Sequence, residues 1–105
     1  FKENVPDIRN SKAAELANFF INSGYNLDLY DPVAQQEEVV KIYGLKLTKP
    51  VGYYDYIILA VPHESLVSNF NQEISKYYKN TSIIFDIKGV LKNKTLKKNI
   101  IYKSL

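Results

Sequence analysis

The run at residues 56–61 consists of six apolar or aromatic residues and ends at Pro62. An unbroken apolar run rich in strand-forming residues is typical of a central strand in a parallel sheet that is covered on both faces. Downstream, four apolar residues recur at helical spacing and predict a helix at residues 64–78 lying across that sheet, namely Leu66, Phe70, Ile74 and Tyr77. A buried strand followed by an amphipathic helix favours the α/β class.

A first helix of about three turns is predicted after residue 12, because apolar residues there share one helical face: Ala13, Leu16, Ala17 and Phe20. Gly24 stands where a left-handed C-terminal cap belongs. Three residues before the helix are competent N-caps, and the sequence does not choose between them: Asp7, Asn10 and Ser11.

The remaining predicted elements are shorter: strands at 25–29, 45–47, 82–87 and 100–102, a helix at 34–43 closed by Gly44, and a connector of unassigned form at 91–99. This alternation indicates a doubly wound, Rossmann-like α/β fold with a mostly parallel sheet in three layers. In such folds ligands gather beyond the carboxyl ends of the strands. The groups at such ends are the opening loop, the corner at residues 62–64 and the turn at residues 86–89.

The composition limits the class of protein. With 105 residues the chain has the size of one domain and is small beside most complete two-substrate enzymes, so we expect a piece of a larger protein. It has no cysteine, which excludes a disulfide framework, a thiolate metal site and a cysteine nucleophile within these residues. No apolar run reaches membrane-spanning length and no signal-peptide pattern is present, so we expect a cytoplasmic protein without membrane contact.

The net charge of +3 conceals an asymmetry, because residues 87–105 carry +6 and the remainder carries −3. A basic tail is compatible with nucleic-acid binding, but specific base recognition usually uses arginine forks, and the chain has a single arginine, Arg9. The nine tyrosines show no ordered spacing of the kind a base-stacking platform needs. We therefore expect a solvated basic face and no nucleic-acid partner.

The first eleven residues, FKENVPDIRNS, bring an aromatic ring, a lysine and an arginine close to the start of the first helix. Pro6 keeps Val5 out of the helical region, so this stretch is predicted to be a loop that delivers polar groups to a helix N-terminus. Such a place suits an anion. Lys88 beside Gly89 also has the attributes of an anion site, a cation next to a backbone that a ligand can approach closely.

This opening motif is similar to the start of the C-terminal, UDP-binding domain of the UDP-glucose/GDP-mannose dehydrogenase family, in particular the branch that oxidises UDP-N-acetylhexosamines. The resemblance continues, by spacing and order, in YDP at residues 30–32, AVPH at residues 60–63 and FDIKG at residues 85–89. It implies that residues 1–105 form a single UDP-binding domain, a C-terminal fragment of a larger dehydrogenase. In the family an apolar strand precedes the motif, so the sheet is expected to lack its first central strand here.

The resemblance also implies an activity for the parent protein. The family oxidises the 6-hydroxyl of a UDP-sugar to the uronate for surface polysaccharide synthesis, reducing two NAD in succession and using a cysteine outside these residues. NAD is then held mainly by an N-terminal domain, next to a central domain of the same chain. The parent is expected to be a homodimer or larger, and the isolated domain is expected to be inactive, with no catalytic residue.

Site residues follow from the same resemblance. Phe1 is expected to pack against the UDP-sugar and Lys2 to pair with its oxygens, while Arg9 is expected to reach the NAD. Lys88 is expected to contact the UDP-sugar, although relatives often have arginine there and lysine lacks the planar fork for bidentate binding. No metal ligand is expected.

Two residues invite other interpretations. Asp31 has the spacing of a ribose-binding acid, but no G-x-G-x-x-G loop precedes it, so a cap before Pro32 is favoured. His63, the single histidine, is interpreted as a helix-start or hydrogen-bonding residue and not as an acid-base catalyst.

The alternative function is a receiver-like or regulatory α/β module without catalysis, because fold alone does not decide function. Such a module needs acids clustered at strand ends, and the candidates are Asp31, Asp55 and Asp86.

Overall fold

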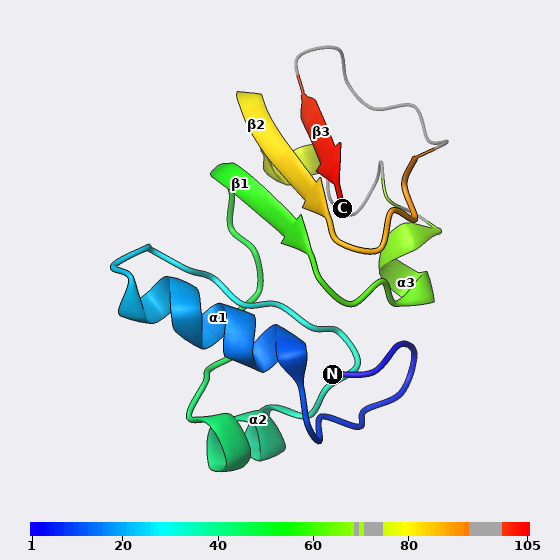
Figure 1. Cartoon of the computed structure of the whole chain (residues 1–105). Helices are drawn as coiled ribbons and strands as arrows, with labels where there is room; N and C mark the ends of the chain where they lie inside the picture. The colour runs from blue at the N-terminus through cyan, green and yellow to red at the C-terminus, as the bar shows by residue number, and fades with distance from the viewer. Residues whose placement is uncertain (69, 71–74, 93–99) are drawn as a thin grey trace. The chain divides into compact units, whose positions relative to one another are not determined.

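A computed structural model describes residues 1–68, 70, 75–92 and 100–105, which fold as two compact units, Phe1–Pro50 and Val51–Leu105 (Figure 1). In the described part of the chain, no helix has both the length and the apolar character needed to cross a membrane.

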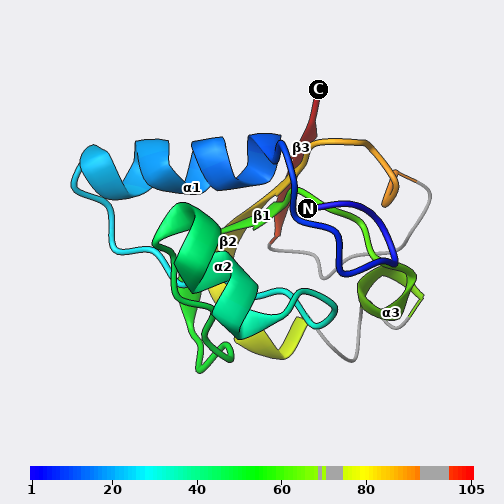
Figure 2. The ribbon, with the colours of Figure 1, turned by 90° about the horizontal axis from the view of Figure 1, so that it is seen from below.

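The first unit contains helices α1, Lys12–Asn22, and α2, Gln36–Tyr43, which lie beside each other in both views (Figures 1 and 2). Ser11 is the N-cap of α1, because its hydroxyl accepts a hydrogen bond from the Ala14 amide at 3.0 Å. Two alanines of α1 and Val39 of α2 are buried with Ile8 and Leu45 in one apolar core, which shows why small side chains stand at Ala14 and Ala17.

Helix α1 ends in two nested hydrogen bonds at Gly24, whose φ is +88°. The Gly24 amide donates to the Ile21 carbonyl and the Tyr25 amide to the Phe20 carbonyl, both at 3.1 Å. The Phe20 and Tyr25 rings meet edge to face with centroids 5.5 Å apart. This is a Schellman motif, and it confirms the predicted left-handed cap at Gly24.

The strands predicted at 25–29 and 45–47 are reduced to one parallel bridge between Leu29 and Leu47. The reason lies in the hydrogen bonds around it, because the Gln36 side-chain oxygen accepts from the Leu47 amide at 2.8 Å. Helix α2 begins at Gln36, two residues later than predicted, and ends as predicted at Gly44, whose φ is +66°.

The second unit is built on a parallel sheet in the order β1-β2-β3, with β1 at Tyr54–Leu59, β2 at Tyr78–Asp86 and β3 at Ile101–Ser104 (Figure 1). A short helix α3, Glu64–Val67, follows β1, and a 3-10 turn η1, Ser75–Tyr77, leads into β2. The parallel sheet with its helices confirms the predicted Rossmann-like α/β class. That the sheet lacks a first central strand stays a prediction.

Two sequence predictions are corrected in this unit. The middle strand in the described part is β2, while the predicted central run forms β1 at one end of the order. The helix predicted to extend to Tyr78 is wrong at its end, because Tyr78 is the first residue of β2 and pairs with Tyr54. Residues 69 and 71–74 of that helix, and residues 93–99 of the predicted connector, lie outside the described residues.

Strand β2 buries alternate side chains, because successive residues of a strand point to opposite faces. Ser82, Ile84 and Asp86 are each 0% exposed. Ile84 belongs to the apolar core of the unit, together with five other buried residues: Leu59, Leu66, Phe70, Tyr78 and Leu91. The alternation therefore carries Asp86, a charged residue, into the interior at the carboxyl end of the strand.

Candidate functional site

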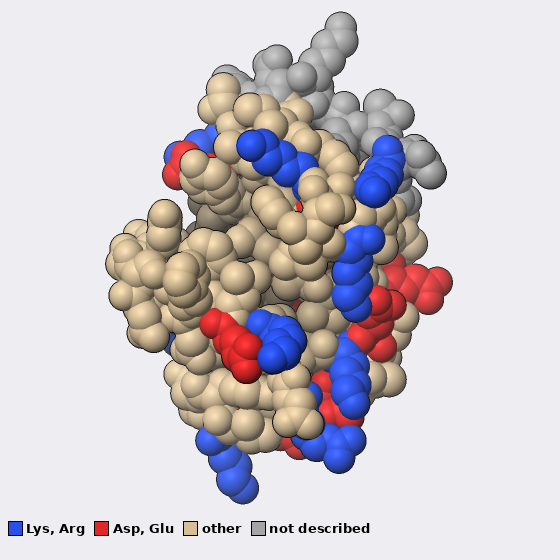
Figure 3. All heavy atoms as spheres, viewed as in Figure 1, with Lys and Arg blue, Asp and Glu red and all other residues tan. Residues whose placement is uncertain are grey.

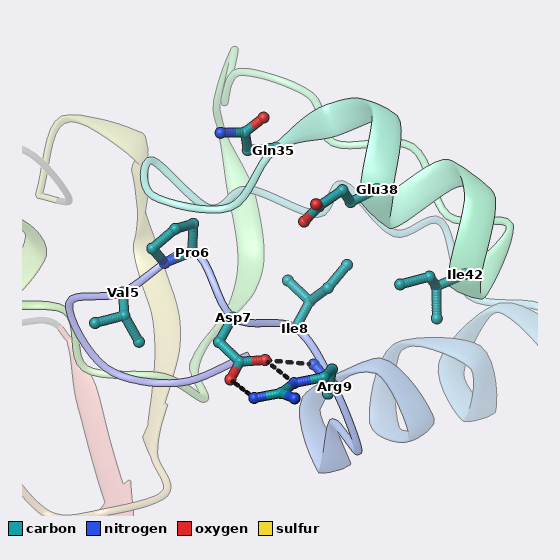
Figure 4. Close-up of a pocket in the computed structure, with 8 residues that line it drawn as sticks. All are labelled: Val5, Pro6, Asp7, Ile8, Arg9, Gln35, Glu38 and Ile42. Carbon is teal, nitrogen blue, oxygen red and sulfur yellow. Dashed lines mark hydrogen bonds and ion pairs between the residues drawn. The ribbon is translucent and has the colours of Figure 1, made fainter.

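The opening loop is organised around the carboxylate of Asp7. One carboxylate oxygen accepts from the Arg9 amide and from Arg9 Nε, both at 3.0 Å, and the other accepts from Arg9 Nη2 at 2.8 Å (Figure 4). Lys2 Nζ lies 3.3 Å from that second oxygen. Asp7 therefore binds two of the three basic residues that the sequence predicts as ligand contacts, Lys2 and Arg9.

The backbone of the loop supports this arrangement. The Lys2 amide donates to the Asp7 carbonyl at 3.1 Å, and Lys2 forms an antiparallel bridge with Val5. The two turns use asparagine at left-handed positions, with φ of +62° at Asn4 and +53° at Asn10. Asparagine tolerates this conformation better than other side-chain-bearing residues. The loop thus has a defined shape that places Lys2 over Asp7.

The ion pairs shift the pKa values of this loop. The hydrogen bonds from the Arg9 side chain, and then from its amide, hold the pKa of Asp7 well below its ordinary range. The side-chain hydrogen bonding to Asp7, and then the negative charge of Asp7, raise the pKa of Arg9. At neutral pH the cluster therefore carries two positive charges and one negative charge, which leaves a net attraction for an anion.

Phe1 lies against the ring of Tyr43, with centroids 6.3 Å apart, at the border of the first unit's core. The Tyr43 hydroxyl accepts from the Ser11 amide at 3.1 Å and donates to the Ile8 carbonyl. Tyr43 of α2 thereby connects the opening loop to the start of α1. The role of Phe1 toward a ligand stays a prediction.

A pocket of about 470 Å³ lies between the opening loop and α2 (Figure 4). Loop residues form one side, where Asp7 binds Arg9, and Glu38 and Ile42 of α2 lie across from that pair, while Gln35 precedes the helix. The lining contains two acids and one already paired base, and Lys2 is not part of it. The pocket is therefore a poor place for a phosphate.

Lys88 is exposed in the turn that follows β2. Gly89 beside it has φ of +68°, and its amide donates to the Asp86 carbonyl at 3.2 Å. A Cβ added to Gly89 would lie 2.9 Å from Lys92 Cε, so the side chain of Lys92 already covers this backbone. The predicted turn with a glycine beside a lysine is confirmed, whereas its role in binding a ligand stays a prediction.

The structure brings together two of the predicted site residues, Lys2 and Arg9, through Asp7. Lys88 belongs to the second unit, so the convergence of Lys2 and Lys88 on one ligand stays a prediction. The residue that sequence reasoning missed is Asp7, which was considered only as a helix cap. The signal was its place two residues before an arginine in a loop, close enough for a side-chain fork.

The helix cap predicted at Asp31 is wrong, because α2 has Gln35 as its N-cap. The Asp31 carboxylate instead accepts from the Val33 and Ala34 amides at 2.8 and 2.9 Å. These bonds form a turn after Pro32, and α2 starts only beyond it. His63 is at the N-cap position of α3 and 1% exposed, and its side chain makes no cap hydrogen bond. Its carbonyl accepts from the Leu66 and Val67 amides, which confirms a helix-start residue.

The two acids of the receiver-like alternative that belong to the second unit, Asp55 and Asp86, lie near opposite ends of β1. Asp55 lies near the start of β1 and pairs with Lys79 at 2.8 Å, whereas Asp86 is level with Leu59 at the other end of that strand. Asp31 belongs to the first unit. Within the described residues no group of three or more acidic, histidine or cysteine side chains is arranged to hold a metal.

The charges on the face shown in Figure 3 are mixed, with several basic side chains lying next to acidic ones. Among the described residues, Lys12 and Glu15 form such a pair, with their charged groups 3.5 Å apart. Paired surface charges of this kind are typical of a solvated face.

Comparison of the sequence with known proteins places the chain in one family of dehydrogenases. Residues 1–93 match the family described as "UDP-glucose/GDP-mannose dehydrogenase family, UDP binding domain". The chain is 36% identical over 98 residues to Protein CapL of Staphylococcus aureus, covering 91% of this chain and 23% of that protein. It is 33% identical to the UDP-N-acetyl-D-glucosamine 6-dehydrogenases of Salmonella typhi and Pseudomonas aeruginosa, covering 87% of this chain and 22% of each relative. The chain thus spans less than a quarter of the length of these relatives.

Proposed function

Because the chain belongs to the UDP-glucose/GDP-mannose dehydrogenase family and matches its UDP-binding domain, we propose that it binds the UDP-sugar substrate of a larger NAD-dependent 6-dehydrogenase. The substrate class we propose is a UDP-hexose or UDP-N-acetylhexosamine, and the names of two relatives favour the N-acetyl form. The parent would convert the 6-hydroxyl to the carboxylate. Its other parts would be an NAD-binding domain and a central domain, assembled as a homodimer or larger.

The observation that carries this proposal is the basic opening loop. Lys2 has 58% of its side chain exposed while its ammonium group stays 3.3 Å from Asp7, so it is oriented and still accessible to a ligand. We assign Lys2 and Lys88 to the oxygens of the diphosphate, because ammonium groups bind phosphate as compact point charges. Phe1 would lie against the same ligand.

Arg9 is the group we assign to NAD. Its side chain is 76% exposed, and Asp7 occupies Nε and Nη2 of its guanidinium. A guanidinium has five N–H donors, so donors are left for a phosphate oxygen. The donor set fits one contact with a dinucleotide and not its enclosure, since the four glycines form no G-x-G-x-x-G loop. NAD, when bound, supplies the hydride acceptor, and this chain contributes only orientation.

The test is a titration of the 105-residue chain with UDP, followed by amide chemical shifts and calorimetry. We expect shift changes centred on the opening loop and on the turn at residues 87–90. Lys2→Gln and Lys88→Gln should each weaken UDP binding about tenfold, the size of one charge-assisted hydrogen bond.

Lys76→Gln is the matched control, because it removes the same charge in η1, just before the start of β2, whereas Lys88 follows the end of that strand. Unchanged UDP affinity in both site variants, or equal losses in the control, would contradict the assignment. The chain alone should not reduce NAD with any UDP-sugar, and turnover by these residues would refute the division of labour.

A further inference from the structure

We propose that Asp86 is a positioning residue that holds the turn at residues 87–90 in the shape that presents Lys88 to the diphosphate. This inference rests on the proposed function and extends it to a residue that touches no ligand. It starts from the fact that an acidic side chain is 0% exposed at the carboxyl end of β2.

A buried carboxylate needs hydrogen bonds, because an ionised group loses its hydration on burial. One oxygen of Asp86 accepts from the Leu91 amide at 2.7 Å and from the Tyr102 hydroxyl at 2.6 Å. Both distances are in the range of charge-assisted bonds. The other oxygen has no hydrogen-bond partner within the described residues. The interactions of the side chain are therefore concentrated on the turn and on β3.

Asp86 closes the turn twice. Its backbone carbonyl accepts from the Gly89 amide at 3.2 Å, and its carboxylate accepts from the Leu91 amide two residues further on. Leu91 is 1% exposed and fixed in the core of the unit. Lys88 lies inside this doubly closed segment, so its backbone is held from both sides while its side chain is exposed.

A fixed backbone matters for a lysine that binds phosphate. The side chain has many rotamers, and each degree of freedom removed before binding reduces the entropy lost on binding. Gly89 allows the turn because its φ of +68° suits glycine, and a larger residue would also meet Lys92. Asp86 and Gly89 thus together determine the backbone position from which the Lys88 side chain extends.

The experiment measures UDP affinity of the 105-residue chain by calorimetry for Asp86→Ala, Lys88→Gln and the double variant. We expect each single change to weaken binding about tenfold and the double variant to bind no more weakly than Lys88→Gln alone. Such non-additivity is expected when one residue acts through the other. Asp86→Asn keeps an oxygen for the Leu91 amide and should retain most of the affinity.

Tyr102→Phe separates positioning from stability. It removes one hydrogen bond from Asp86 but leaves the bond to the Leu91 amide, so the protein should be less stable with nearly unchanged UDP affinity. The Leu91 amide shift should move in Asp86→Ala and stay close to its original value in Tyr102→Phe.

Gly89→Ala tests the turn without removing Asp86 or Lys88, and it decides the matter if Asp86→Ala does not fold. It should weaken UDP binding several-fold, whereas Gly44→Ala, at a φ of +66° and with open space around it, should leave UDP binding unchanged. The role of Asp86 would be overturned if the affinity losses of Asp86→Ala and Lys88→Gln multiplied in the double variant, or if folded Asp86→Ala or Gly89→Ala bound UDP with full affinity. The assignment of Lys88 to the diphosphate would survive these results. Full affinity in Lys88→Gln would overturn the assignment of Lys88 and the inference together.

Discussion

Arg9 donates three hydrogen bonds to Asp7, one from its backbone amide and two from its guanidinium, within a span of three residues. The same carboxylate lies 3.3 Å from Lys2. Two cations that we assign to different ligands, a UDP-sugar and NAD, therefore share one partner. A substitution at Asp7 should therefore change the environment of both Lys2 and Arg9.

The first prediction concerns acid. Because the pKa of Asp7 is held low in the folded chain, the folded form keeps this carboxylate ionised below pH 4, where the unfolded chain takes up a proton. Its contribution to stability is present above that ordinary pKa and is lost as the pH falls toward the folded value. Carboxyl carbon shifts followed from pH 6 to 2 should show that Asp7 titrates well below the ordinary pKa of an aspartate.

The matched variants for this titration are Arg9→Gln and Lys12→Gln, which remove equal charges. Arg9→Gln should bring the Asp7 midpoint close to its ordinary value, because the largest cause of the shift is gone. Lys12 pairs with Glu15 and should have little effect. An unchanged midpoint in Arg9→Gln would contradict the ion-pair explanation.

The second prediction concerns the charge that Asp7 contributes. Asp7→Asn removes a negative charge next to Lys2 while keeping an acceptor for the Arg9 amide. UDP should bind about threefold more tightly at low salt, and the difference should shrink above about 0.5 M salt, where charges are screened within a few ångströms. Calorimetry at two salt concentrations checks this. Weaker binding at both would show that Asp7 acts mainly by orienting Lys2.

The third prediction compares two tyrosines of the second unit. The hydroxyl of Tyr78 is buried with no hydrogen-bond partner within the described residues, and burial raises its pKa. Tyr78→Phe should therefore stabilise the unit by about 1 kcal/mol, because an unpaired buried hydroxyl costs free energy. Tyr102→Phe should destabilise it by about 2 kcal/mol, since its hydroxyl donates to the Asp86 carboxylate. Urea unfolding of both variants measures the change in the free energy of unfolding. A loss of stability in Tyr78→Phe would contradict the expected gain.

The fourth prediction concerns the pKa of Tyr102, which is raised by burial and then by the hydrogen bond to Asp86. A raised pKa in the folded state means that the stabilisation is complete below pH 10 and is lost as the pH rises through the folded value. The difference in phenolate absorbance between wild type and Tyr102→Phe should titrate above pH 10. In Asp86→Asn this midpoint should fall, and a constant midpoint would argue against the Asp86 contribution.

The fifth prediction concerns the cap of α1. Ser11→Ala should destabilise the first unit by about 1 kcal/mol, because the Ala14 amide loses its acceptor. Ser11→Asp keeps an acceptor and adds a negative charge at the helix N-terminus, so it should be as stable as wild type. Thermal unfolding compares the two. Equal losses would show that the buried position of Ser11, which is 5% exposed, does not accommodate the larger aspartate, and no loss in Ser11→Ala would contradict the cap.

Local chemistry made several elements predictable from sequence. Gly24 and Gly44 mark helix ends because left-handed caps select glycine, and the apolar residues of β1 and β2 mark a parallel sheet. Boundaries were harder. The residues before α2 form a turn because the carboxylate of Asp31 takes two amides, a competition that apolar periodicity does not report. Tyr78 fits a helical pattern and a strand equally well, and its pairing with Tyr54 decided the outcome.

The sequence led to candidate site residues but not to the hydrogen bonds that connect them to their neighbours. The resemblance pointed to Lys2, Arg9 and Lys88 by position in motifs. The roles of Asp7 and Asp86 depend on which amide, guanidinium or hydroxyl lies within 3 Å of each carboxylate, and those distances arise only when the loops are folded. Asp7, a candidate helix cap in the sequence, holds Arg9 in the opening loop. Asp86, a candidate acid of a receiver-like module, holds the turn that carries Lys88.

Because burial alternates along β2, the number of residues in the strand determines which residue points inward at its end. Ser82, Ile84 and Asp86 share the interior face, so one residue inserted between Ile84 and Asp86 would turn the carboxylate outward. Leu91 and Tyr102 would then lose their common acceptor, and the segment carrying Lys88 would be released from the sheet. The number of residues in β2 thus determines whether the turn at residues 87–90 has an ordered conformation.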